Sequence, residues 1–390
     1  MKNDLNIRDE EILLLGLCRM SFNAELTVML KALAEGTFDW SYFASLANVH
    51  GVAALVYHNL EKLDLLHYTT AEASDTLKKA LMMSLSRNTR NTEAMADVLR
   101  LLNRENIKTV LLKGLALELS VYGNAGLRQM TDVDVLLTRD NCLKTRKILM
   151  NNGFTSLPVK SVFHKAIIAD AGKHLPSLIK NGFSVEFHHQ LFGAEKDNLT
   201  GKLYETSSEK EIKGEKTFIP EARIFFLYLV RHLCMHEMNN ESQLRLYTDL
   251  VVLIENFRDE IINVDLIEYA KKAGMSQMLA WKLEPLRDLW GISFPEWINE
   301  FINKWYNPDS INKFIFFLKS HKDNPPSDKA KYYRYHLSEI PGMHRKILFL
   351  LGDLFPTIRF MKKRYNLSKS WQAIFYYPLR FGKLWYLVKR

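Results

Sequence analysis

The sequence predicts an α+β protein in which a small mixed β-sheet is flanked by helical domains. Residues 106–215 hold short, β-branched apolar runs that alternate with helical patterns, as in a sheet with helices packed on it. The segments on either side repeat apolar residues at helical spacing instead. We therefore expect four regions: an N-terminal helical domain over 1–105, a core over 106–215, a second helical domain over 216–305 and a basic, aromatic-rich C-terminal region over 306–390.

Two helices are predicted in the first region. The segment from Glu10 to Met20 places apolar residues at helical spacing, although Gly16 interrupts it. A longer helix is expected from about Thr70 to Asn103, because this stretch is rich in helix formers and contains neither Gly nor Pro. Both helices are interpreted as parts of a packed scaffold.

The core region is predicted to contain three strands and at least two helices. Strands are expected over 107–112, 133–138 and 183–187. The turn dipeptide Asn181-Gly182 precedes the last of them. A helix is expected over 114–122, and Asp140 is expected to be the N-cap of another helix that ends at Asn152-Gly153.

Two amphipathic helices are predicted after the core. Their apolar faces comprise Ala222, Phe225, Phe226, Leu229, Val230 and Leu233 in the first, and Leu244, Tyr247, Leu250, Val251 and Ile254 in the second. The segment Asn324-Pro-Pro-Ser-Asp328 is typical of a linker or an exposed loop.

The composition is that of a globular protein from a reducing compartment. The chain has 390 residues, of which 47% are hydrophobic and 25% are charged, so it is long enough to bury a large core. Three widely spaced cysteines do not suggest a disulfide framework. No signal peptide is expected, and no apolar run approaches the roughly 18–20 residues of a membrane span. We therefore expect a cytoplasmic location.

Three acidic residues in the core region point to a metal site. Residues i and i+2 of a strand face the same side, so Asp132 and Asp134 are expected to project together. Two carboxylates this close repel each other unless a cation lies between them. Glu186 has Val185 and Phe187 as neighbours, and it is expected to leave its strand opposite to them. Such acids suit Mg²⁺, and three of them on adjacent strands are able to hold two metal ions roughly 3.5–4 Å apart.

A Lys-Gly turn precedes these acids and is suited to phosphate. Gly114 follows a predicted strand and opens a predicted helix, where backbone N–H groups bind phosphate readily. Lys113 adds a positive charge beside this turn. Arg128, four residues before Asp132, is suited to a bidentate phosphate contact.

Together these motifs resemble a known family. The residues concerned are Leu112-Lys-Gly-Leu-Ala-Leu, then Tyr122-Gly, Leu127-Arg128 and Thr131-Asp-Val-Asp-Val-Leu-Leu137. This pattern is similar to the signature of a bacterial nucleotidyltransferase-like family within the polymerase-β superfamily. In that group a Gly turn is followed by Asp-x-Asp on one strand and by a third acid on a later strand. The third acid is usually an Asp just before a His, whereas this chain has Glu186 there. Lys113-Gly114 stands where Gly-Ser or Gly-Gly is typical.

The resemblance implies a fold, an activity and a site. The fold is a nucleotidyltransferase core, and the activity is transfer of a nucleoside monophosphate from an NTP to a hydroxyl acceptor, with release of pyrophosphate. The acceptor is unknown, since sugars, lipids, proteins and RNA all offer hydroxyls. Mg²⁺ or Mn²⁺ is the implied cofactor. The implied catalytic metal ligands are Asp132, Asp134 and Glu186, and the implied nucleotide-binding residues are Lys113, Gly114 and Arg128.

Two pairs of residues at i and i+4 lie in the second helical domain. His232 and His236 share a helix face, but Leu233 stands where a zinc protease would carry its Glu. We interpret the pair as polar residues at the domain junction, with contact to nucleotide or acceptor left open. Arg245 and Asp249 are expected to form a surface ion pair, with a role in lining the cleft as the alternative.

The C-terminal region carries the positive charge of the chain. From Tyr306 to Arg390 there are 17 Lys or Arg residues and 5 Asp or Glu residues, an excess larger than the net charge of +9 for the whole chain. Aromatic residues are interleaved with these basic residues. Three interpretations are open: aromatics packed on the core beside a solvated basic face, peripheral contact with an anionic membrane, and nucleic-acid binding, which is not excluded.

Two alternatives to the enzyme therefore remain. One is a catalytically inactive nucleotide-binding protein. The other is an accessory protein peripheral to the inner face of the membrane, in surface-polysaccharide assembly, with the C-terminal region as its working part.

Overall fold

The computed structural model describes residues 7–171, 173–192, 199–238, 243–307, 309–319, 330, 333–334, 337–338 and 340–389. It is an α+β structure with one seven-stranded mixed sheet and many flanking helices, which confirms the predicted fold class. The linker predicted at Asn324–Asp328 lies outside the described residues.

The sheet has its predicted strands at the centre. Its order is β3-β4-β5-β2-β1-β7-β6, with β2 antiparallel to β1 and parallel to β5. β1, β2 and β5 correspond to the three strands that the sequence predicts. The strands are β1 (Val110–Leu112), β2 (Val133–Leu136), β3 (Thr155–Ser156), β4 (Leu178–Lys180), β5 (Phe183–His188), β6 (Ser208–Ile212) and β7 (Glu215–Ile219).

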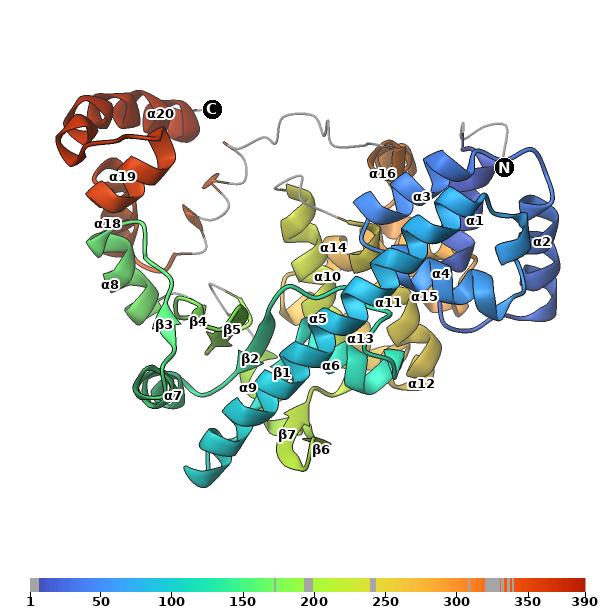
Figure 1. The fold of residues 1–390 in the computed structure, drawn as a ribbon, viewed down its shortest axis with the longest axis horizontal. Coiled ribbons are helices and arrows are strands. Elements are labelled where there is room, and N and C mark those ends of the chain that lie inside the picture. The colour runs from blue at the N-terminus through green and yellow to red at the C-terminus, as the bar shows by residue number, and fades with distance from the viewer. Residues whose placement is uncertain are drawn as a thin grey trace.

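One long helix connects the N-terminal helices with the sheet. α5 (Ala71–Arg104) has 34 residues, about 50 Å of helix, and Thr70 is its N-cap, with a side chain that accepts from the Ala73 amide. Figure 1 shows α5 running from the N-terminal helices across to the sheet. Those helices are α1 (Asp9–Leu17), α2 (Ala24–Ala34), α3 (Trp40–Val49) and α4 (Ala53–Lys62).

The helices inserted in the core region pack around the sheet. β1 leads directly into α6 (Lys113–Leu117), which continues as the π-helix η2 (Glu118–Tyr122). The expected helix after β2 is α7 (Arg139–Asn151), but Asp140 is not its N-cap. Thr138 has that role, because its hydroxyl accepts from the Asn141 amide directly after the strand. The others are α8 (Val162–Ala171) and α9 (Leu199–Thr206).

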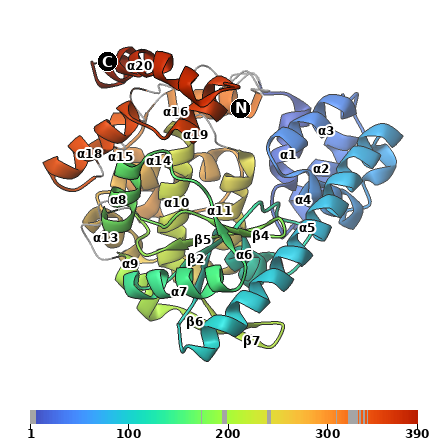
Figure 2. The same ribbon diagram turned by 60° about the vertical axis from the view of Figure 1, so that its left-hand side comes forward.

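Both predicted amphipathic helices are present after the sheet. α10 (Ala222–Met238) and α11 (Leu244–Asn256) bury the predicted apolar faces. In the view of Figure 2, α10 and α7 lie on opposite sides of the central strands. The later helices of the body are α12 (Arg258–Ile261), α13 (Val264–Lys272), α14 (Ser276–Asp288), α15 (Glu296–Lys304) and α16 (Asp309–Lys319).

A single hydrophobic core extends from the N-terminal helices through the sheet to Leu318 on α16, and no described residue beyond Leu318 belongs to it. The last helices are α18 (Met343–Leu354), α19 (Ile358–Tyr365), the 3-10 helix η3 (Ser370–Tyr376) and α20 (Tyr377–Lys389). α18 packs on α8 and α20 packs on α18, at one corner of the molecule in Figure 1. In the described part of the chain, none of the helices combines the length and apolar character needed to cross a bilayer.

Candidate active site

The strand register brings the predicted acids together. Asp134 on β2 is opposite Leu112, the last residue of β1, and is paired on its other side with Glu186 on β5. Asp132 lies just before β2, on the same side of the chain as Asp134 by the alternation of strand side chains. Because β2 and β5 are parallel neighbours, side chains at paired positions project from the same face. This edge of the sheet is therefore acidic, as predicted.

The Lys-Gly turn lies beside this acidic edge. The chain passes from β1 into α6 at Lys113, whose φ of 48° is in the left-handed region that non-glycine residues rarely adopt. Gly114 follows in close contact with its neighbours. A Cβ at this position would lie 2.5 Å from Nη1 of Arg128 and 2.5 Å from Sδ of Met130. Glycine is thus required here because of close approach.

Asp134 is the centre of the polar contacts in the site. Its Oδ1 accepts from Nζ of Lys113 at 2.6 Å and lies 2.8 Å from Nε2 of His188. Burial alone would raise the pKa of Asp134, but the Lys113 charge and the His188 hydrogen bond outweigh it and hold that pKa far below its usual range. Asp134 is therefore ionised and pre-oriented.

The other two acids are less constrained. Glu186 accepts from the Ser177 hydroxyl at 2.7 Å through Oε1, and its Oε2 lies 3.8 Å from Nε2 of His188. The Thr131 hydroxyl donates to Asp132 at 3.0 Å. Burial and the negative charge of Asp134 raise the pKa of Asp132. The raised pKa reflects negative charge that a bound cation would relieve.

One ligand atom from each of Asp134, Glu186 and His188 forms a group in which all atoms lie within 4.8 Å of one another. Carboxylate oxygens beside an imidazole suit divalent ions that bind oxygen and nitrogen. Burial lowers the pKa of His188 to about 4, so its imidazole is neutral at pH 7; Nε2–H then donates to Asp134, and a metal at Nε2 would take the place of that proton. The residues present fit a divalent metal, and the sequence did not single out His188 as one of the ligands.

Further polar residues lie in the field of the site, and of these the sequence connected only His232 with it. Tyr228 and His232 come from α10, and Lys173 lies just before β4. Burial raises the pKa of Tyr228, and the charges of Asp134 and Glu186 add to that rise. Burial and the Lys113 charge lower the pKa of His232 and of Lys173. These shifts show that all three side chains feel the charges of the site.

Arg128 is fixed by a buried ion pair. Its Nε and Nη2 donate to the two carboxylate oxygens of Asp249 on α11 at 2.8 and 2.7 Å, and Tyr122 also donates to Asp249 at 3.0 Å. Arg128 and Asp249 are 5% and 1% exposed. Because Nη1 lies beside Gly114, the guanidinium faces the turn that the sequence predicts to bind phosphate. That phosphate contact stays a prediction.

The surface ion pair predicted between Arg245 and Asp249 is wrong. Asp249 is buried and pairs with Arg128, 121 positions earlier in the chain. Arg245 donates instead to the carbonyl oxygen of Gln129 at 2.5 Å and to the side chain of Gln243 at 3.0 Å. The docking of α11 against η2 thus replaces a local i, i+4 contact with a long-range one.

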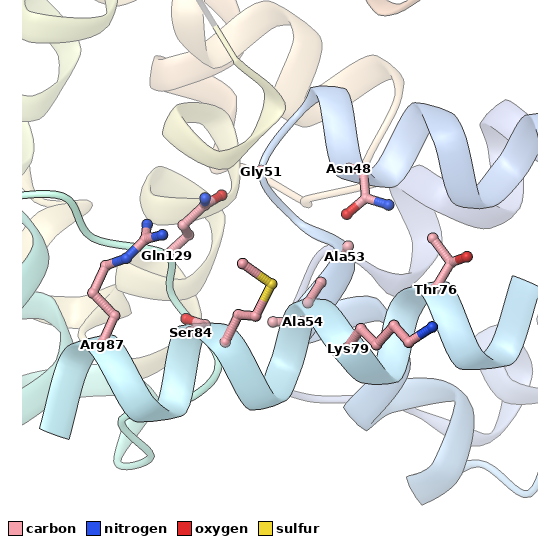
Figure 3. Close-up of a pocket in the computed structure, with 11 residues that line it drawn as sticks. Asn48, Gly51, Ala53, Ala54, Thr76, Lys79, Ser84, Arg87 and Gln129 are labelled. Carbon is pink, nitrogen blue, oxygen red and sulfur yellow. The ribbon is translucent and has the colours of Figure 1, made fainter.

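A polar pocket of about 320 Å³ lies between the N-terminal helices and α5, beside the loop that leads to Asp132. Figure 3 shows Ser84, Arg87 and Gln129 at one side of it and Asn48, Thr76 and Lys79 at the other. Gln129 connects this pocket with the site through its contact with Arg245. The pocket is lined by hydrogen-bonding groups and cations, but none of the three acids lines it.

We expect Gly114→Ala to destabilise the protein by about 1–3 kcal/mol, the usual cost of overpacking a tight site. The added methyl group would collide with Arg128, which cannot swing away without breaking its pair with Asp249. The midpoint of urea denaturation would measure the loss. Gly36→Ala is the matched control, because a Cβ there has ordinary spacing, with Leu33 O at 3.4 Å as its nearest neighbour. Equal stability of the two variants would contradict the close approach.

Comparison with known proteins agrees with this geometry. A family model described as an uncharacterised nucleotidyltransferase matches residues 36–291, which is more than half of the chain and includes the whole sheet and the acidic edge. No curated protein matches the sequence. The match confirms the resemblance to a nucleotidyltransferase-like family. The chain therefore belongs to a family of uncharacterised nucleotidyltransferases.

Proposed function

We propose that the protein is a metal-dependent nucleotidyltransferase that transfers a nucleoside monophosphate from an NTP to a hydroxyl acceptor. The observation that carries the proposal is the pairing of Asp134 with Glu186 beside the Lys113–Gly114 turn, with Asp132 in the field of Asp134, in a chain of a nucleotidyltransferase family. Assignment to the polymerase-β superfamily and a cytoplasmic location belong to the same proposal.

The reaction exchanges a phosphoanhydride bond of the NTP for a phosphate ester bond to the acceptor. The acceptor oxygen forms a bond to the α-phosphorus, and the bond from that phosphorus to the oxygen bridging to the β-phosphate breaks. Pyrophosphate leaves with the electron pair, and the proton of the hydroxyl is released. Negative charge grows on the phosphate oxygens, so the catalyst needs fixed positive groups and bound cations there.

The acids would hold the divalent metal, and Asp134 and Glu186 are the members of the set that the strand pairing fixes most firmly. When bound, Mg²⁺ or Mn²⁺ supplies positive charge to the triphosphate and lowers the pKa of the attacking hydroxyl. Lys113 stays charged, because the effect of Asp134 on its pKa outweighs that of burial. Arg128 is held by Asp249 in one orientation, with Nη1 toward Gly114. Both cations are thus positioned before substrate binds.

A second candidate is a nucleotide-binding protein without turnover. It is favoured by one observation: Lys113 and His188 both contact Oδ1 of Asp134, the atom that a metal would also use. A site in which lysine permanently neutralises that carboxylate would bind nucleotide but would not release pyrophosphate.

Thermal denaturation with ATP, GTP, CTP or UTP, with and without Mg²⁺ or Mn²⁺, tests the proposal. We expect one NTP to stabilise the wild-type protein in the presence of metal, by about 2.7 kcal/mol at a concentration 100 times its Kd. Asp134→Asn should lose the metal-dependent part of this effect. If no NTP stabilises the protein under any of these conditions, the nucleotide site is absent and the proposal fails. Stabilisation without pyrophosphate release would favour the second candidate.

A further inference from the structure

The C-terminal helices expose an apolar face that is unusual for a globular protein. Trp371, Ile374, Phe375, Leu379 and Trp385 are each 57–69% exposed. We call these five residues the apolar face. Trp371, Ile374 and Phe375 lie on the 3-10 helix η3, and Leu379 and Trp385 lie on α20, the α-helix that follows it directly. Contiguous exposed apolar surface marks a site of interaction.

A polar network lies inside these helices, beside the buried Met361 and Ala373. Arg380 on α20 is only 6% exposed, and its Nε and Nη2 donate to the carbonyl oxygen of Asp353 at 3.0 and 2.9 Å. The Asp353 carboxylate in turn accepts from Lys160, just before α8, and from Tyr333. This network holds α20 against α18 and α8, while Trp371, Ile374, Phe375 and Leu379 remain mostly exposed.

Positive charge is concentrated in the same C-terminal segment as the apolar face. After Asp353 the chain contains no acidic residue. Arg359, Lys363, Arg364 and Lys369, which we call the basic rim, are all exposed on or just after α19, the helix that packs against η3. Three of these four also line a pocket of about 580 Å³ between α19 and residues 157–159, where no acidic residue is present. An anionic partner is thus favoured.

The combination distinguishes among anionic partners. Nucleic acid would use the basic rim and stack on Trp371 or Phe375, but it offers nothing apolar to cover Ile374 and Leu379. An anionic bilayer offers acidic headgroups for the basic rim and an acyl boundary for both aliphatic and aromatic side chains. We propose that the apolar face and the basic rim form a docking surface for an anionic lipid bilayer, with the helices lying in the plane of the headgroups. This inference does not depend on the proposed nucleotidyltransferase activity.

Flotation of the full-length protein with vesicles tests the proposal. We expect binding to vesicles of phosphatidylcholine mixed with phosphatidylglycerol, and much weaker binding to phosphatidylcholine alone. In the rim variant, Lys363, Arg364 and Lys369 are replaced by Gln, and partitioning should fall by about 100-fold, since each basic residue near an anionic surface contributes roughly fivefold. In the face variant, Trp371, Phe375 and Leu379 are replaced by Ser, and partitioning should fall by at least about 100-fold.

The double variant Val264→Ser and Phe316→Ser is the matched control, because these residues are 76% and 57% exposed on α13 and α16. It should bind vesicles as the wild type does. If the face variant fails to fold, Phe375→Ser alone replaces it, with an expected loss of about tenfold. Equal binding by the face variant and the wild type would overturn the proposal. If the wild-type protein does not bind anionic vesicles but binds RNA, the proposal is overturned. It is also overturned if the wild type does not bind these vesicles but self-associates, and the face variant loses that self-association.

Discussion

Asp134→Asn is expected to reduce pyrophosphate release by at least about 10³-fold, the equivalent of about 4 kcal/mol of transition-state stabilisation. Lys113, His188 and Glu186 all converge on this carboxylate. The amide still accepts hydrogen bonds from Lys113 and His188, but it lacks the charge that would hold a divalent metal. The measurement is release of pyrophosphate from whichever NTP stabilises the protein, with sugars, lipid alcohols and proteins offered as acceptors.

The fold should survive this change. The Lys113 side chain is 19% exposed and also lies in the field of Glu186, so it keeps water and a second carboxylate near its charge. The denaturation midpoint is nevertheless expected to fall, because the charge of Asp134 is what outweighs the burial of Lys113, so activity is compared at a temperature at which both proteins are folded. Glu209→Gln, on the edge strand β6, is the control that removes a carboxylate outside the site. Full activity in Asp134→Asn would show that the acids do not act on the nucleotide.

His188 provides a finer division of roles within the same assay. If His188 is a metal ligand, His188→Gln should lower the affinity for metal, so that a higher metal concentration is needed for half-maximal activity. If His188 only positions Asp134 through the 2.8 Å contact, the metal concentration for half-maximal activity should stay the same while the rate falls. The two outcomes distinguish the predicted ligands Asp132, Asp134 and Glu186 from a set in which His188 takes part.

The acidic edge was predictable from the sequence because it depends on strand periodicity. Asp134 and Glu186 each have apolar neighbours on both sides in the chain, so alternation places both acids on the face opposite to those neighbours. The structure pairs these two positions directly. The turn at Asn181-Gly182 was predictable for a similar reason, since both residues adopt the positive φ that such dipeptides favour. The same alternation extended by two residues would have marked His188.

Other features could not be predicted, because they arise from tertiary contacts. Strand β6 reads Ser-Glu-Lys-Glu-Ile and has a single apolar residue, so hydrophobic alternation does not reveal it. Tyr228 lies off the predicted apolar face of α10, and its burial comes from tertiary packing. Lys173 approaches the site through the backbone contacts of His189 and Gln190 to its carbonyl oxygen. None of these placements follows from local spacing.

The pairing of Asp249 with Arg128 is the clearest case, and it leads to the largest expected effect on stability. Asp249→Ala should destabilise the protein by about 3–5 kcal/mol, because Arg128 would remain buried without a partner for its charge. Tyr122 would lose its acceptor at the same time. The midpoint of urea denaturation measures the change. Glu268→Ala removes an exposed ion pair with Lys272 instead and should leave that midpoint unchanged.

A double variant separates stability from function at this pair. Replacing a buried ion pair by apolar residues of similar volume is often neutral, so Arg128→Met with Asp249→Leu should recover most of the stability lost in Asp249→Ala. It should not recover metal-dependent stabilisation by NTP, because no guanidinium would then face Gly114. Recovery of both properties would show that Arg128 serves only to join the turn after η2 to α11. Recovery of stability alone would place Arg128 at the nucleotide, oriented by a carboxylate from the second helical domain.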